Sequence, residues 1–256
     1  MIASLGMYDF AETQGANDRL WALIRDGMRA VGLSAPQDLT RGAGAYWQAW
    51  QSPDLTLSQT CGFPYRTQLH NKVALIGTPD YGVAGCPPGH YCSIFLARAG
   101  DPREVLADFD GAAFVFNEGL SQSGWAAPQN HARSVGLTLR PTLRSGAHIL
   151  SARAVSEGRA DITAIDAVTW SMLQEWFPAV QSLKAVGATS PTPALPYICA
   201  SHTAAPRLFA IISTAIDILP TEDRKILRLR GFVAIPPEAY LAVLTPPTPD
   251  DLGMRD

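Results

Sequence analysis

The most informative stretch of the chain is Phe114-Val115-Phe116-Asn117-Glu118-Gly119-Leu120-Ser121-Gln122-Ser123-Gly124. Its apolar start predicts a short buried strand, and its Ser-x-Ser-Gly end predicts the first turn of a helix, because serine is a preferred N-cap residue. Such a turn presents backbone N–H groups, two hydroxyls and the positive end of a helix dipole at one point. This combination suits a bound oxyanion such as a phosphate, phosphonate or carboxylate.

Strands and helices alternate on both sides of this stretch, which predicts an α/β fold with largely parallel sheets. The apolar residues of the first long helix recur at helical spacing on one face. The expected strands are 2–5, 55–58, 73–77, 91–97, 112–116, 142–145, 160–165, 183–186 and 197–200, and the longer helices are 17–31, 121–135, 148–157 and 207–219.

The central block of the chain has the pattern of a complete α/β unit inserted into another. We therefore expect two lobes, a discontinuous first lobe of 1–97 plus 191–256 and an inserted second lobe of 98–190. Two connections cross between them, and prolines stiffen the second, near 191–200. Ligands of such folds bind in a cleft at the carboxyl ends of strands. The tail 246–256 is expected to fray.

Composition limits the classes of partner. The 256 residues are 47% apolar and 17% charged, which is typical of a soluble globular protein, and the net charge of −3 favours no nucleic-acid partner. No stretch approaches the roughly 20 apolar residues that span a bilayer, so we expect no membrane insertion. The N-terminus lacks the basic and apolar regions of a secretory signal, which indicates either a cytoplasmic protein or a signal missing from this sequence.

The chain shows no pattern that calls for a metal or a cofactor. Its four cysteines include no CxxC pair, so a zinc site is not expected. Cys86 and Cys92 flank a short loop and could form an oxidised pair, although small reduced residues are the preferred interpretation. No Ser-His-Asp order and no activated cysteine stands out, so no catalytic residue is assigned and an enzyme is not the leading expectation.

Five segments together resemble a known family. They contain the Gly-Phe-Pro-Tyr turn of 61–65, the strand 91–98, the Ser-rich turn of 117–124, the run from Ser145-Gly146-Ala147-His148 to Asp166, and 193–197. In their order and spacing the chain is similar, over about residues 1–240, to the substrate-binding proteins of phosphonate and phosphate-type ABC transporters. That resemblance implies the two-lobed type 2 periplasmic-binding fold, with two hinge crossings.

The resemblance also implies a cleft that closes on a small anionic ligand, a periplasmic location and an ABC transporter permease as partner. It departs at Gln122, which replaces a more usual hydroxyl residue. A glutamine both donates and accepts hydrogen bonds, so a protonated or partly esterified oxyanion is the expected ligand. The expected ligand-binding residues are Ser121, Gln122, Ser123 and His148 around the anion, Gly124 for close backbone approach, Tyr65, Tyr91 and Asp166 along the remaining wall, and Tyr8 after the first strand.

Simpler roles remain open for these residues. Ser121 and Ser123 could serve only as helix caps, and Asp166 could bind an amino group of the ligand, cap the following helix, or do both. Each tyrosine could simply bury its ring. The alternative functions are a cytoplasmic enzyme, in which His148 and Asp166 form an acid–base pair, and a sensor domain on the same fold; either would act on a small carboxylate or phosphorylated metabolite.

Overall fold

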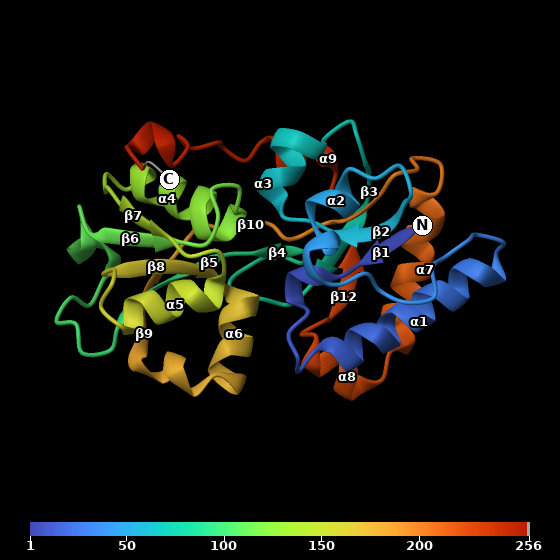
Figure 1. The fold of residues 1–256 in the computed structure, drawn as a ribbon, viewed down its shortest axis with the longest axis horizontal. Coiled ribbons are helices and arrows are strands. Elements are labelled where there is room, and N and C mark those ends of the chain that lie inside the picture. Colours follow the sequence, from blue (N-terminus) through green and yellow to red (C-terminus); the bar gives the residue numbers. More distant parts are fainter. Residues whose placement is uncertain (255–256) are drawn as a thin grey trace. The chain divides into compact units, whose positions relative to one another are not determined.

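The computed structural model describes residues 1–254 and divides the chain into two compact units (Figure 1). The first contains Met1–His90 and Pro193–Leu241, and the second contains Tyr91–Thr192 and residues 242–254. The chain therefore passes between the units three times, one more than the sequence predicts. The expected lobes, 1–97 plus 191–256 and 98–190, also differ at both ends of the second unit, for the reasons given below.

The first unit is built on a five-stranded mixed sheet in the order β1-β2-β11-β3-β12. Only β1 and β2 pair in parallel, and the other three pairings are antiparallel. Helices α1 and α7 pack on each other (Figure 1), and α1 buries Leu20, Trp21, Ile24 and Met28 on one face. The elements are β1 (Ile2–Ser4), α1 (Gln14–Ala30), α2 (Trp47–Trp50), β2 (Leu55–Gln59), α3 (Gly62–Pro64), β3 (Ala74–Asp80), β11 (Tyr197–Cys199), α7 (Ala205–Ile218), α8 (Thr221–Ile226), β12 (Gly231–Val233) and α9 (Pro237–Leu241).

The second unit has its own five-stranded sheet, in the order β7-β6-β8-β5-β9. Its elements are β5 (Ser93–Arg98), β6 (Ala113–Phe116), α4 (Ala127–Ser134), β7 (Arg140–Arg144), α5 (His148–Ser156), β8 (Ile162–Asp166), α6 (Ala167–Trp176) and β9 (Leu183–Ala188). A two-stranded sheet pairs β10 (Thr192–Pro193) with β4 (His90–Tyr91).

Strand direction in the second sheet corrects the expectation of largely parallel sheets. Strands β7, β6 and β8 are mutually parallel, because helices carry the chain from each one to the next. Strand β5 is antiparallel to both β8 and β9. Since β5 lies between two strands of the second sheet, it belongs to the second unit and not, as expected, to the first.

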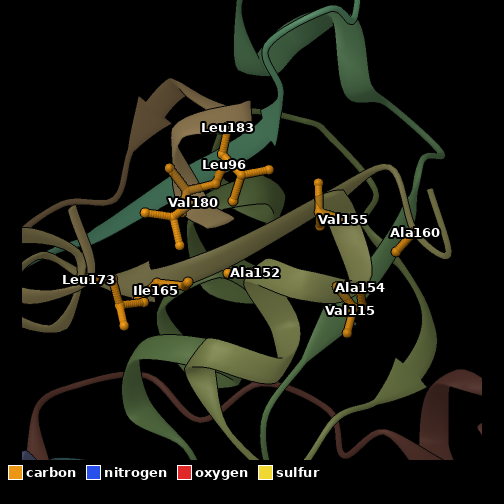
Figure 2. Close-up of a cluster of buried hydrophobic side chains, with 10 residues drawn as sticks. All are labelled: Leu96, Val115, Ala152, Ala154, Val155, Ala160, Ile165, Leu173, Val180 and Leu183. Carbon is orange, nitrogen blue, oxygen red and sulfur yellow. The ribbon is translucent and has the colours of Figure 1, made fainter. Parts of the chain in front are cut away.

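The core of the second unit lies on both faces of this sheet. Leu96, Val115 and Ile165 pack with side chains of α5 and α6 (Figure 2). On the alternate positions, Phe116 packs against Trp125 just before α4, with ring centroids 4.6 Å apart. The period of two along each strand therefore separates the α4 side of the sheet from the α5 and α6 side, as Figure 1 also shows.

An ion-pair network lies at the ends of three strands of this unit. The Asp101 carboxylate accepts hydrogen bonds from Nε and Nη2 of Arg103, at 2.9 and 2.7 Å. Arg103 also pairs with Asp161 at 3.1 Å, and Asp161 accepts from the N–H of Ala113 at the start of β6. Arg98 lies within 4 Å of both carboxylates. The network thus connects the ends of β5, β6 and β8.

The sequence located the elements well. Every expected strand and every expected longer helix has a counterpart displaced by at most a few residues, whereas β10 and β12 were not expected as strands. The tail is different, because it does not fray over its described part. Asn130 of α4 donates to the carbonyl of Leu244, so the tail joins the second unit and not the first. Residues 255–256 of the expected frayed tail lie outside the described residues.

Candidate functional site

Three helical segments begin at one edge of the second sheet, each in the connection that follows one of its three parallel strands. The chain runs β6, β7, β8, but the sheet order is β7-β6-β8, so the second connection passes back across β6. Because such crossovers are right-handed, the two connecting helices lie on opposite faces. Ligands of α/β sheets bind beyond the carboxyl ends of strands at such a reversal. The polar side chains at this edge are therefore candidates for ligand binding.

Side chains from all three strand–helix junctions meet here. The hydroxyl of Ser123, after β6, lies 3.0 Å from Nε2 of His148, the first residue of α5. The carboxylate of Asp166, at the end of β8, lies 3.5 Å from the same nitrogen. All three are largely buried, with side-chain exposures of 15% for His148 and 4% for Asp166. The structure thus brings together three residues that the sequence predicted for the site.

Ser121 shapes the turn that leads into α4. Its hydroxyl accepts the N–H of Gly124 at 2.9 Å, which confirms the helix-capping role. Its carbonyl accepts from the N–H groups of Trp125 and Ala126, which makes Gln122–Ala126 a wide π-helical turn. Ser123 does not cap the helix and instead contacts His148. The two serines therefore have different tasks.

The turn has no room for a side chain at position 124, which is why a glycine is required there. A Cβ atom there would overlap the side-chain oxygen of Asn117 and would lie 3.2 Å from Cε1 of His148. Asn117 was not predicted as a site residue, although it directly follows β6. Its Oδ1 is buried and has no hydrogen-bond partner within residues 1–254. The sequence signal that could have found it is its place between a buried strand and the Ser-rich turn.

Asp166 divides its two oxygens between two tasks. Oδ1 accepts the N–H of Thr169 at 2.8 Å and caps α6, which confirms the capping alternative. Oδ2 faces His148. A carboxylate only accepts hydrogen bonds, so the proton of a neutral His148 is favoured on Nε2. Binding of a ligand amino group by Asp166 stays a prediction.

Burial lowers the pKa of His148 below its ordinary value of 6.5, although the nearby charge of Asp166 acts in the opposite direction. The second ring nitrogen, Nδ1, is buried and has no hydrogen-bond partner in the described part of the chain. A bound anion would favour the charged imidazole and would therefore oppose the effect of burial.

The same geometry differs from that of a serine hydrolase. In a Ser-His-Asp triad the hydroxyl and the carboxylate contact opposite ring nitrogens of the histidine. Here Ser123 and Asp166 both lie near Nε2 of His148. The carboxylate therefore favours the tautomer of His148 that has its proton on Nε2. In that tautomer Nε2 cannot remove a proton from the hydroxyl of Ser123. The cluster is better arranged to hold an anion than to activate a nucleophile.

The remaining predicted residues are buried in their own units. Gln122 is buried in the turn, and Tyr91 is buried at the start of the second unit. In the first unit, the ring of Tyr8 packs edge-on against Tyr81, with centroids 5.2 Å apart. Tyr65 packs edge-on against Tyr240 at 5.3 Å, and burial raises the pKa of Tyr65. Each tyrosine thus buries its ring, and contact with a ligand stays a prediction for all three.

Within residues 1–254, no group of three or more His, Cys, Asp or Glu side chains is placed to hold a metal ion. Cys86 and Cys92 are not joined by a disulfide, and neither are the other two cysteines. Across the same residues, no helix is long and apolar enough to cross a bilayer.

A comparison with known protein families shows which family the chain belongs to. Residues 38–240, more than half of the chain, match the family described as "ABC transporter, phosphonate, periplasmic substrate-binding protein". The chain belongs to this family. Its members are described as periplasmic substrate-binding proteins of ABC transporters. The resemblance seen in the sequence is therefore confirmed. No curated protein matches the chain in sequence.

Solved structures share the fold of this family member. XAC2383 from Xanthomonas citri, bound to a chloride ion, aligns with a TM-score of 0.69 at 15% identity over 93% of this chain and 92% of its own. PhnD1 from Prochlorococcus marinus (MIT 9301), in complex with methylphosphonate, aligns with a TM-score of 0.67 at 14% identity over 93% and 94%. A histidine kinase sensor domain with similarity to periplasmic binding proteins aligns with a TM-score of 0.56 at 14% identity over 96% and 98%. The two-lobed periplasmic-binding fold is thus confirmed.

Proposed function

We propose that this protein captures a small phosphorus oxyanion, a phosphonate foremost, for import by an ABC transporter. The observation that carries the proposal is the meeting of Ser123, His148 and Asp166 where three helices begin beyond three parallel strands. Helix N-termini attract anions, because their first N–H groups lack intrahelical acceptors and the dipole is positive there. Membership of the phosphonate-binding family supports the same ligand class.

Each residue of the turn has a task in this proposal. The hydroxyl of Ser121 accepts from Gly124, which leaves its own O–H to donate to the ligand. The hydroxyl of Ser123 and the imidazole of His148 donate to further anion oxygens, and Gln122 pairs with a protonated or esterified oxygen. Gly124 allows the backbone to come close. Asp166 orients His148 and can accept from an amino group of the ligand.

Tyr8, Tyr65 and Tyr91 are further proposed contacts, each through its hydroxyl. Replacement by phenylalanine keeps the buried ring and removes only the hydroxyl. If the proposal holds, each Tyr→Phe variant folds and binds the anion more weakly. An unchanged affinity would limit that tyrosine to packing.

Calorimetric titration tests the ligand directly. Methylphosphonate, phosphate, phosphite and sulfate are titrated into the purified protein, with malate as a carboxylate comparison. A ligand at 100 times its dissociation constant stabilises the folded protein by about 2.7 kcal/mol, which a thermal melt detects. The proposal predicts the tightest binding among the phosphorus oxyanions. Absence of heat and of thermal shift with all of them would refute it.

Transport and location need separate tests, since they concern the cell and not the isolated protein. We propose a periplasmic location and an ABC permease as partner. Deletion of the gene should abolish growth on methylphosphonate as sole phosphorus source, and fractionation should recover the protein from the periplasm. A protein that binds the anion but is dispensable for this growth would instead fit a sensor domain on the same fold.

The receptor and enzyme hypotheses predict opposite fates for the ligand. If the protein is a receptor, phosphorus NMR of methylphosphonate or a phosphorylated metabolite incubated with the protein should show the ligand unchanged. Turnover that disappears in His148→Asn would favour the enzyme and overturn the receptor proposal.

A further inference from the structure

The tail of the chain contacts both flanks of the Ser-rich turn. The indole N–H of Trp125 donates to the carbonyl of Pro247 at 3.2 Å. On the other flank, Pro249 packs so closely on Gly119 that a Cβ atom on the glycine would lie 3.2 Å from Cγ of the proline. Gly119 lies two residues before Ser121, and Trp125 lies two residues after Ser123. The tail therefore brackets the turn that carries the proposed anion contacts.

The bracketing segment is itself well ordered by local bonds. Asp251 accepts from the N–H and the hydroxyl of Thr248, at 2.9 and 2.8 Å, and its own N–H donates back to that hydroxyl. The N–H of Met254 donates to the carbonyl of Pro249 at 3.0 Å. Three prolines, Pro246, Pro247 and Pro249, restrict the backbone further. The segment can thus act as a stiff support.

Trp125 connects this support to the interior. Its ring is fully buried against Phe116 of β6, while its N–H reaches the tail. Five residues later, Asn130 donates to the carbonyl of Leu244 at 2.7 Å. The start of α4 is therefore held between the sheet and the tail, and the turn that precedes it has little freedom to change shape.

From these contacts we infer that residues 244–254, which we name the strap, are a positioning element for the anion turn. The inference rests on the proposed function for its ligand. A turn held in its binding conformation binds more tightly, because less ordering is required when the ligand arrives. By reciprocity, a ligand that orders the turn also holds the strap in place. Trp125 is then a positioning residue that acts through the strap.

The first test needs no ligand. A chain ending at Pro246 lacks the contacts of Pro247 and Pro249, and Trp125→Phe removes the indole donor together with part of the buried ring. Amide hydrogen exchange of residues 122–126 should be at least about tenfold faster in both variants than in the full chain, because local opening becomes easier. Trp21→Phe is the matched control, since it loses the same part of a buried ring while the indole N–H of Trp21 has no hydrogen-bond partner in residues 1–254. Unchanged exchange in folded variants would overturn the inference.

The second test measures affinity for methylphosphonate. The shortened chain and Trp125→Phe should each bind about 5- to 20-fold more weakly, and Trp125→Phe should have no further effect in the shortened chain. Exchange of residues 244–254 in the full chain should slow when the ligand is bound. If the full chain does not bind methylphosphonate, the proposed function fails, but the exchange of residues 122–126 still tests whether the strap positions the turn. If the shortened chain does not fold, the inference is tested with Trp125→Phe alone.

Discussion

The hydroxyl of Ser123 lies 3.0 Å from Nε2 of His148, although 25 residues separate the two in the chain. Ser123 belongs to the turn after β6, and His148 opens the helix after β7. Their contact therefore joins the ends of two neighbouring parallel strands. Because both can donate to an anion, the pair is the centre of the proposed site and the first target for mutation.

Replacement of Ser123 by alanine should weaken anion binding by about 10- to 100-fold, since a hydrogen bond to a charged group contributes about 1.5–3 kcal/mol. Isothermal titration with methylphosphonate measures the change. Ser134→Ala is the control, because Ser134 is exposed at the far end of α4, where its hydroxyl donates to the carbonyl of His131. Equal affinity in the two variants would remove Ser123 from the site.

Replacement of Gly124 by alanine should destabilise the protein by about 1–3 kcal/mol, because the added methyl group overlaps the side chain of Asn117. Urea unfolding measures the loss. The double variant Gly124→Ala with Asn117→Ala should lose less than Gly124→Ala alone, since the colliding oxygen is gone. A double variant that loses the sum of both single effects would show that this overlap is not the cause.

The stability of the ligand-free protein should depend on pH through His148. Burial lowers its folded-state pKa below the ordinary 6.5, so between these two values the unfolded chain binds more protons than the folded one. This contribution is fully present above about pH 6.5 and is lost as pH falls toward the folded-state pKa. Urea midpoints of the protein and of His148→Asn, compared from pH 7.5 to pH 5.5, should converge as pH falls. A constant difference would contradict the prediction.

Replacement of Asp101 by asparagine should destabilise the second unit by about 2 kcal/mol at pH 7, because Arg103 loses a buried charged partner. The hydrogen bonds of Arg103 hold the pKa of Asp101 well below its usual range. Its stabilisation is therefore present above the unfolded-state pKa of about 4 and is lost as pH falls through the folded-state pKa. Thermal melts at pH 7 and pH 3 should differ less for Asp101→Asn than for the unchanged protein. Asp26→Asn, which removes an exposed pair with Arg25, should leave the pH 7 melting temperature unchanged.

Local features of this protein could be predicted from its sequence, because they depend on neighbouring residues. Ser121 caps the turn, as its residue type and position indicated. Asp166 caps α6 for the same reason. The strands of the second unit were located by their apolar runs, and the order of short motifs was sufficient to indicate the family.

Long-range pairing decided the rest. The antiparallel direction of β5 depends on which strands flank it, and a local sequence pattern does not predict the neighbours of a strand. The ordered tail was missed because its bonds are made to Asn130 and Trp125, more than 100 residues earlier in the chain. The buried oxygen of Asn117 became visible only beside Gly124.

The sequence by itself determined the Ser-rich turn, its cap and its likeness to phosphonate-binding proteins. Only the tertiary structure decided that Ser123, His148 and Asp166 meet, and that Ser121 caps the turn while Ser123 contacts His148. The physical reason is that capping and periodicity are set within a few residues, whereas the meeting of three helix starts depends on the order and direction of strands in the sheet.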